Sequence, residues 1–155
     1  MTSEAGRDPE LDLIRERLFM LEEEEMLIIK AHLLTERFMW QLLERKLALP
    51  SVSDKLRLRY LQLLNLTRIV SAAPSSLDWL WDALTNLNRV RNKLAHELVD
   101  PDKLGPLVTS IFKTTEEHVT TSDLPIRSRV DKLRWVLMIL CAVTYRADQR
   151  GTSDK

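Results

Sequence analysis

The sequence predicts an all-α protein, built as a single up-and-down bundle of five or six helices. Apolar residues recur at steps of three and four along most of the chain, which is the spacing of an amphipathic helix. Three of the 155 residues are glycine, fewer than the many tight turns of a β-sandwich or barrel would use. A chain of this length can bury the core of one domain. We expect that domain at 8–148, between disordered tails at 1–7 and 149–155.

The composition excludes several classes of protein. The 23 basic and 23 acidic side chains balance, so there is no overall positive field for non-specific nucleic-acid binding, and any RNA contact must come from local patches. The single cysteine, Cys141, cannot form an intramolecular disulfide, and its apolar neighbours predict a buried thiol. The polar start of the chain does not resemble a signal peptide, and the longest apolar run, 26–34, is too short for a bilayer. We therefore expect a cytoplasmic protein with no membrane partner.

The first two predicted helices cover the chain to residue 46. Asp8-Pro9 begins the first, because an acidic side chain caps a helix and proline fits its first position. The apolar face of this helix is Leu11, Ile14, Leu18 and Leu21. The second helix covers about 24–46, before Leu49-Pro50. Its apolar stripe is Met26, Ile29, Leu33, Trp40, Leu43 and Leu47. Glu36 occupies the one position missing from this series.

Four more helices follow. Ser53 or Asp54 caps the third, which ends near 71–74. Its basic side chains form either a solvated surface, which is the more common case, or a phosphate track; they are Lys55, Arg57, Arg59 and Arg68. The fourth helix begins near Ser75 or Ser76 and ends before Asp100-Pro101. The fifth is shorter and reaches about His118. A loop at 120–125 precedes the sixth helix, at about 127–146.

The fourth predicted helix carries two residues that its apolar pattern does not explain. Its stripe is Leu77, Leu80, Trp81, Leu84, Leu87, Leu94, Ala95 and Leu98. Arg91 falls in the middle of this stripe, where another leucine is expected, so its charge must be paired or must serve a site. His96, five residues later, lies about 140° around the helix from Arg91. It shares a polar flank with Thr85, Asn88, Arg89 and Asn92.

Glu36 and Arg91 are each a single charge within an apolar stripe. An unpaired buried charge is strongly unfavourable, so we expect an ion pair between these two residues, at the contact of the second and fourth helices. Glu36 would then fix the side chain of Arg91 and direct its guanidinium toward the cleft in which His96 lies.

Other kinds of site have little support in the sequence. Three glycines cannot form a glycine-rich phosphate loop, no two histidines have the spacing of a helical metal pair, and one cysteine cannot build a Cys-based zinc site. We therefore expect neither a metal nor a cofactor. Packing is a better interpretation of Cys141, His32 and His118 than a functional role. Trp79 and Trp81 could stack on bases, although Trp81 falls on the core side of its helix.

The stretch Arg91-Asn92-Lys93-Leu94-Ala95-His96 resembles the R-x4-H motif of the HEPN superfamily, a group of all-helical domains found in prokaryotic toxins, phage-defence systems and RNA-processing enzymes. The wider sequence LNRVRNKLAHEL, preceded by KAHLLTERFMWQLLERKL, is most similar to the mannitol-repressor branch. The resemblance covers about Glu24 to Leu98. The motif gains specificity from its place late in an amphipathic helix and from the asparagine that follows the arginine.

The resemblance implies a helical bundle that forms a dimer through its motif helices, with the Arg and His of both protomers in one composite cleft. Active members cleave RNA without a metal, by attack of the ribose 2′-hydroxyl on the adjacent phosphate. By this carry-over His96 is the acid–base residue, Arg91 holds the phosphate, and Asn92 orients the histidine or the RNA. Many toxins of the superfamily carry a tyrosine two places after the histidine, which a partner enzyme modifies. Leu98 stands there, which argues against silencing by that route.

Two functions from different classes fit these residues. The first is a metal-independent endoribonuclease, acting as a toxin or phage-defence effector on RNA, with a second copy of the chain and an antitoxin or regulatory protein as partners. The alternative is a non-catalytic regulatory or interaction domain of the mannitol-repressor kind, in which Arg91 and His96 are structural. A shared open cleft holding both residues would favour catalysis, and burial of both in a dry core would favour the alternative.

Overall fold

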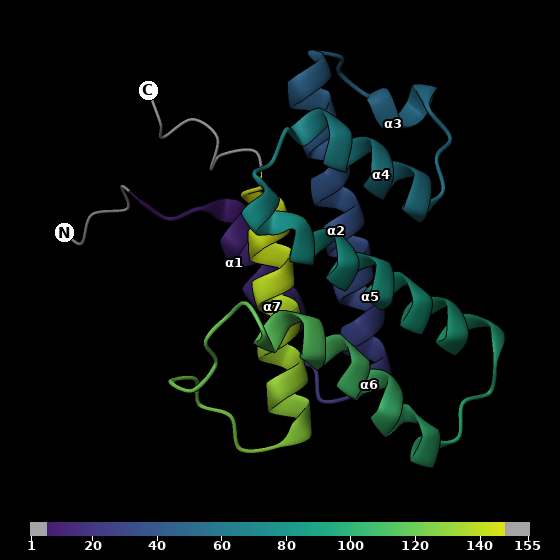
Figure 1. Cartoon of the computed structure of the whole chain (residues 1–155), viewed down its shortest axis with the longest axis vertical. Helices are drawn as coiled ribbons and strands as arrows, with labels where there is room; N and C mark the ends of the chain where they lie inside the picture. Colours follow the sequence, from purple (N-terminus) through teal and green to yellow (C-terminus); the bar gives the residue numbers. More distant parts are fainter. Residues whose placement is uncertain (1–5, 148–155) are drawn as a thin grey trace.

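The computed structural model describes residues 6–147, and all of the regular structure in that range is helical (Figure 1). Its seven α-helices and one short 3-10 helix are α1 (Pro9–Leu18), α2 (Glu24–Leu47), α3 (Val52–Lys55), α4 (Tyr60–Ser71), η1 (Ser75–Leu77), α5 (Asp78–His96), α6 (Pro101–Glu116) and α7 (Arg129–Tyr145). The all-α prediction is confirmed for these residues. The predicted tails at 1–7 and 149–155 lie outside the described range, apart from residues 6 and 7. None of the helices in this range is both long enough and apolar enough to cross a membrane.

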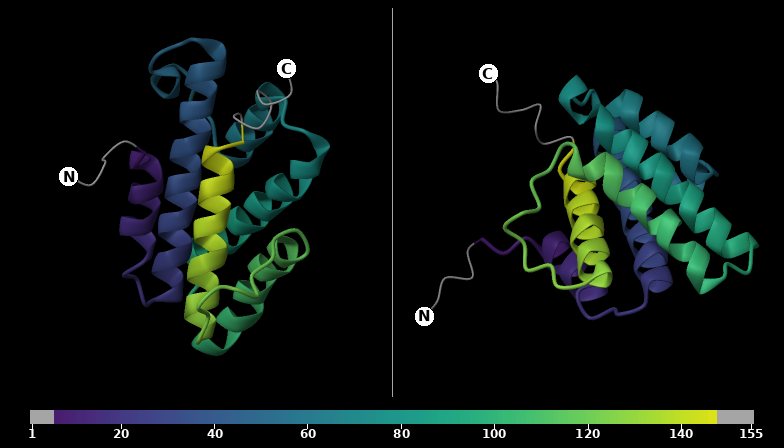
Figure 2. Two further views of the ribbon diagram at one scale, coloured as in Figure 1. Left: turned by 90° about the vertical axis from the view of Figure 1, so that its left-hand side faces the viewer. Right: turned by 60° about the horizontal axis from the view of Figure 1, so that its bottom comes forward.

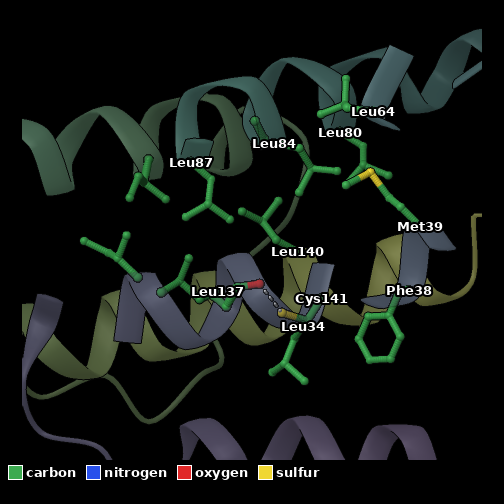
Figure 3. Close-up of a cluster of buried hydrophobic side chains, with 14 of the residues drawn as sticks. Leu34, Phe38, Met39, Leu64, Leu80, Leu84, Leu87, Leu137, Leu140 and Cys141 are labelled. Atoms are coloured by element: carbon green, nitrogen blue, oxygen red, sulfur yellow. Dashed lines mark hydrogen bonds between the residues drawn. The ribbon is translucent and has the colours of Figure 1, made fainter. Parts of the chain in front are cut away.

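The helices pack as two layers (Figure 2). α1, α2 and α7 run side by side in one layer, and α4, α5 and α6 lie across them in the other. α2 is the central element, because α1, α3, α4, α5 and α7 all pack against it. The core fills the space between the layers and also the space between the helices of the first layer (Figure 3). Its labelled side chains are Leu34, Phe38 and Met39 of α2, Leu64 of α4, Leu80, Leu84 and Leu87 of α5, and Leu137, Leu140 and Cys141 of α7.

Local signals in the sequence set several features of these helices. Asp8 caps α1 as predicted, because its Oδ1 accepts the backbone N–H of Glu10 at 3.1 Å. Ser128 caps α7 in the same way, accepting the backbone N–H of Asp131 at 3.1 Å. The thiol of Cys141 is buried, as expected, and its Sγ donates to the carbonyl oxygen of Ala31 across the contact of α7 with α2, at 3.8 Å (Figure 3).

Most of the predicted apolar stripe of α2 does not face the core. Met26, Leu33 and Leu47 are 37%, 50% and 39% exposed, and Leu43 alone in that series is buried. The buried residues of α2 are Leu27, Ile28, Ala31, His32, Leu34, Thr35, Phe38, Met39, Leu42 and Leu43. Because five helices contact α2, apolar residues occupy most of its circumference, and helical periodicity alone cannot choose the buried face. Glu36, which we placed in the stripe, is half-buried.

The third predicted helix is two helices in the structure. α3 is a single turn, and the backbone is extended at Leu56 (φ −110, ψ 118) and at Arg59 (φ −73, ψ 159), before α4 begins. The alternation of apolar and basic residues over 56–59 explains the break, because this period suits an extended chain. Gln62 marks the start of α4, since its Oε1 accepts the backbone N–H of Arg59 at 2.9 Å.

The predicted apolar stripe of α5 is confirmed over the first part of the helix and then leaves the core. Its buried members are Leu77, Leu80, Trp81, Leu84 and Leu87. Further along, Leu94 is half-buried and Ala95 is exposed. Leu98, just beyond the end of the helix, has a relative exposure of 105%. The last turn of the stripe therefore contacts solvent in a single chain.

Candidate functional site

All four residues predicted to form the site line one pocket. This pocket has a volume of about 660 Å³ and lies between α2, α5 and the start of α4. α2 contributes Glu36, and α5 contributes Arg91, Asn92 and His96. The other lining residues are His32 of α2, Asn88 of α5, and Leu58, Arg59, Tyr60, Leu61 and Gln62 at the start of α4. The fold thus places polar side chains from three separate segments around one space.

Helical spacing explains why α5 presents so many polar groups to the pocket. Asn88, Asn92 and His96 are four residues apart, so they lie one above another along the same side of the helix, with Arg91 beside them. The Arg91 side chain is half-buried, whereas Asn92 and His96 are exposed. Nη1 of Arg91 donates to Oδ1 of Asn92 at 3.2 Å. The motif residues are therefore accessible to a ligand.

Glu36 and Arg91 do not form the ion pair that we predicted. Of the described residues, it is Asn92 that receives a hydrogen bond from the Arg91 guanidinium. Glu36 still interacts electrostatically with Arg91. Burial raises the pKa of the Glu36 carboxyl, and the positive charge of Arg91 opposes that shift. The prediction was wrong because it placed both charges in a dry core. Each side chain is half-buried on the pocket wall, where solvent removes the need for a contact partner.

A buried polar network that joins α2 to α4 and α5, and that the sequence pattern did not predict, lies behind the pocket. His32 is 5% exposed, and its Nε2 donates to Oδ1 of Asn88 at 3.0 Å. The imidazole stacks on the ring of Tyr60, with centroids 4.0 Å apart and planes 24° apart. Tyr60 Oη and Thr35 Oγ1 are 2.8 Å apart, and Thr35 Oγ1 donates to the carbonyl oxygen of His32 at 3.0 Å. Because that bond uses the Thr35 hydrogen, the phenol is the donor in the first one.

The buried imidazole should make stability depend on pH. Burial, the largest effect, and the charge of Arg91 lower the pKa of His32 below 6.5, although its bond to Asn88 opposes the shift. The unfolded chain therefore binds more protons in the interval below 6.5, and the stabilisation is complete above that value and is lost as the pH falls toward the folded pKa. We expect the Tm to decrease from about pH 7 to about pH 5 by more in the native chain than in His32→Gln, measured by circular dichroism. Equal decreases in both proteins would contradict this.

The other candidate residues lie away from this pocket. His118 is exposed, and its ring stacks on Trp79 with centroids 5.5 Å apart. Trp81 is buried, as expected. Burial raises the pKa of the Cys141 thiol, which disfavours a nucleophilic thiolate. Within residues 6–147, no group of three or more His, Cys, Asp or Glu side chains is placed to hold a metal ion. A second pocket, of about 550 Å³ between α1 and α7, has a mainly apolar lining without a histidine.

The pocket between α2, α4 and α5 combines a permanent cation, several amide groups and an exposed imidazole. Arg91 offers N–H donors in a planar fork that fits the oxygens of a phosphate. His96 offers an exposed imidazole, the group that general acid–base catalysis uses most often. This set of groups can hold an anion and transfer a proton beside it. Comparison of the chain with protein-family models, with curated proteins and with solved structures finds no match.

Proposed function

We propose that this protein is a metal-independent endoribonuclease of the HEPN type, acting as a two-fold dimer. The observation that supports it is the convergence of Arg91, Asn92 and His96 on one open pocket. Neither Arg91 nor His96 is enclosed in the core, as purely structural residues would be. The resemblance of 91–96 to the R-x4-H motif supplies the reaction class.

The proposed reaction is an internal transesterification of RNA. Arg91 holds the non-bridging oxygens of the phosphate and stabilises the charge that develops on them. The ribose 2′-oxygen attacks phosphorus, and the bond from phosphorus to the 5′-oxygen breaks. His96 of one protomer accepts the proton of the 2′-hydroxyl, and His96 of the second protomer donates a proton to the leaving 5′-oxygen. The products are a 2′,3′-cyclic phosphate and a 5′-hydroxyl end.

The dimer in this proposal uses the exposed end of the α5 stripe. Leu94, Ala95 and Leu98 continue the apolar face of α5 into solvent. An apolar surface beside the motif favours contact with an identical surface on a second copy, and a two-fold contact of this kind pairs each residue set with itself. His96 lies between Ala95 and Leu98 in sequence, so such a contact would bring two pockets together. The resemblance also suggests a toxin or phage-defence role, with an antitoxin as a further partner.

The test is cleavage of RNA by the purified full-length chain. We expect the protein to cut a mixed-sequence oligoribonucleotide and to leave 2′,3′-cyclic phosphate ends, with the same rate in the presence of EDTA. A matched oligonucleotide with 2′-deoxyribose at every position should remain intact, because it lacks the attacking group. Cleavage that stops when EDTA is added, or equal cleavage of the deoxy substrate, would exclude the proposed mechanism.

A second candidate function is a non-catalytic regulatory or interaction domain. The hydrogen bond from Arg91 to Asn92 favours it, because this bond holds the guanidinium in place without a substrate. A protein of this kind would bind RNA or a protein partner through the same pocket and leave the RNA intact. Binding of the oligoribonucleotide without any cleavage would therefore support this function over the first.

A further inference from the structure

The buried amide of Asn88 has one end that the described chain does not satisfy. Asn88 is 6% exposed and lines the pocket. Its Oδ1 accepts the hydrogen on Nε2 of His32, which leaves both N–H groups on Nδ2 without an acceptor among the described residues. Nδ2 is not fully enclosed by the protein. It therefore meets solvent, and the solvent next to Asn88 is that of the pocket.

We propose that Nδ2 of Asn88 binds a phosphate oxygen of RNA beside Arg91, and that His32 is a positioning residue for this amide. The inference deepens the proposed function and rests on it for the identity of the ligand. Arg59 and Arg91 both line the pocket, against one lining carboxylate, that of Glu36, so the space favours an anion. A phosphodiester has two non-bridging oxygens, which the guanidinium and the amide can bind together.

The network around His32, with the imidazole hydrogen on Nε2, favours the orientation in which the N–H groups of Asn88 face the pocket. The imidazole is held between its stacking contact with Tyr60 and its hydrogen bond to Asn88. Burial raises the pKa of Tyr60, so its hydroxyl keeps the hydrogen that it donates to Thr35. If the Asn88 amide rotated by half a turn, its N–H groups would face Nε2 of His32, and the hydrogen bond could re-form only if the imidazole proton moved from Nε2 to Nδ1. The donors are thus held toward the pocket before any ligand arrives.

RNA affinity in a cleavage-deficient background tests the role of Asn88. A fluorescein-labelled oligoribonucleotide would be titrated with His96→Ala protein and followed by fluorescence anisotropy. Adding Asn88→Asp keeps the acceptor for His32 but replaces the donors with an anionic oxygen, so we expect the Kd to rise by about 10- to 100-fold. Asn65→Asp is the matched control, because Asn65 is an exposed residue of α4 that does not line the pocket. Its Kd should change by less than about twofold.

Two substitutions of His32 test its positioning role in the same background. His32→Phe keeps an aromatic ring against Tyr60 but removes the N–H donor, so the amide of Asn88 is no longer fixed. We expect the Kd to rise by about 2- to 10-fold. His32→Gln supplies an amide N–H within reach of Asn88 and should restore most of the affinity. If His32 only supports the fold, both variants will lower the Tm and neither will change the Kd of the folded protein.

The results of the binding and cleavage experiments distinguish a failure of the Asn88 phosphate site from a failure of the nuclease function. Inorganic phosphate should compete with the RNA probe in the native pocket and should compete more weakly after Asn88→Asp. If the native chain binds RNA in an Asn88-dependent way but does not cleave it, the phosphate site stands and the nuclease function fails. If the chain cleaves RNA and Asn88→Asp behaves like Asn65→Asp, the nuclease function stands and this inference is wrong. The absence of any binding to RNA or phosphate overturns it as well.

Discussion

His96→Ala and Arg91→Ala should each reduce RNA cleavage to the background rate. Loss of the group that transfers the proton is expected to lower the rate by about 10²- to 10⁴-fold. Loss of the guanidinium that stabilises the developing phosphate charge is expected to lower it by about 10²- to 10³-fold. Both side chains lie on the open wall of the pocket and contribute little to the core, so both variants should remain folded. The measurement is the initial rate with the labelled oligoribonucleotide, together with the Tm of each protein.

Matched substitutions elsewhere provide the controls for this experiment. His118→Ala removes another exposed histidine near a helix end, one that stacks on Trp79 and does not line the pocket. Arg89→Ala removes an exposed arginine of α5, two residues from Arg91. Both control variants should keep the rate of the native chain. Cleavage that survives His96→Ala and Arg91→Ala, or that disappears in the controls, would show that the activity does not come from this site.

Leu87→Ala should strongly destabilise the fold. The side chain is fully buried in the core between the helix layers (Figure 3). Shortening a buried leucine removes apolar contacts and leaves a cavity, which typically costs about 2–5 kcal/mol of the free energy of unfolding. Leu98→Ala is the same substitution on the same predicted stripe, but Leu98 has a relative exposure of 105%. In the monomer it should change stability by less than about 0.5 kcal/mol, as measured by urea denaturation.

The same pair of variants tests the proposed dimer. If the exposed end of the stripe is the dimer contact, Leu98→Ala should raise the dimer dissociation constant while the folded protomer keeps its stability. Light scattering across a concentration series measures this. A native chain that stays monomeric at micromolar concentration would argue against the dimer, and so would a Leu98→Ala variant that associates as strongly as the native chain.

Local chemistry in the sequence was sufficient to predict much of the fold. The cap at Asp8-Pro9 and the apolar period of α5 as far as Leu87 needed no knowledge of distant residues, and both were confirmed. The buried face of α2 could not be predicted in the same way, because it is decided by the five helices that pack around it. The alternation at 56–59 is typical of extended chain, but the leucine spacing on either side of it favours a continuous helix.

The candidate site shows the same division between local and distant information. Arg91, Asn92 and His96 share one helix, so their spacing predicted that they would lie together, and they line one pocket. The contact between His32 and Asn88 joins positions 56 residues apart, which no periodicity can reveal. One signal was present: His32 lies four residues before Glu36, and Asn88 four residues before Asn92, so each is on the same helical side as a residue already selected.

The buried thiol of Cys141 can be used to measure how often α7 separates from α2. The side chain lies between α7 and α2, hydrogen-bonded to the carbonyl of Ala31, with no exposure to solvent. The reactive thiolate can form only when these two helices separate, so the rate of alkylation by a small thiol reagent measures how often they do. Because the chain has one cysteine, the label needs no mutagenesis to be specific. It would report the motions of α2, the helix that carries His32 and Glu36 to the pocket.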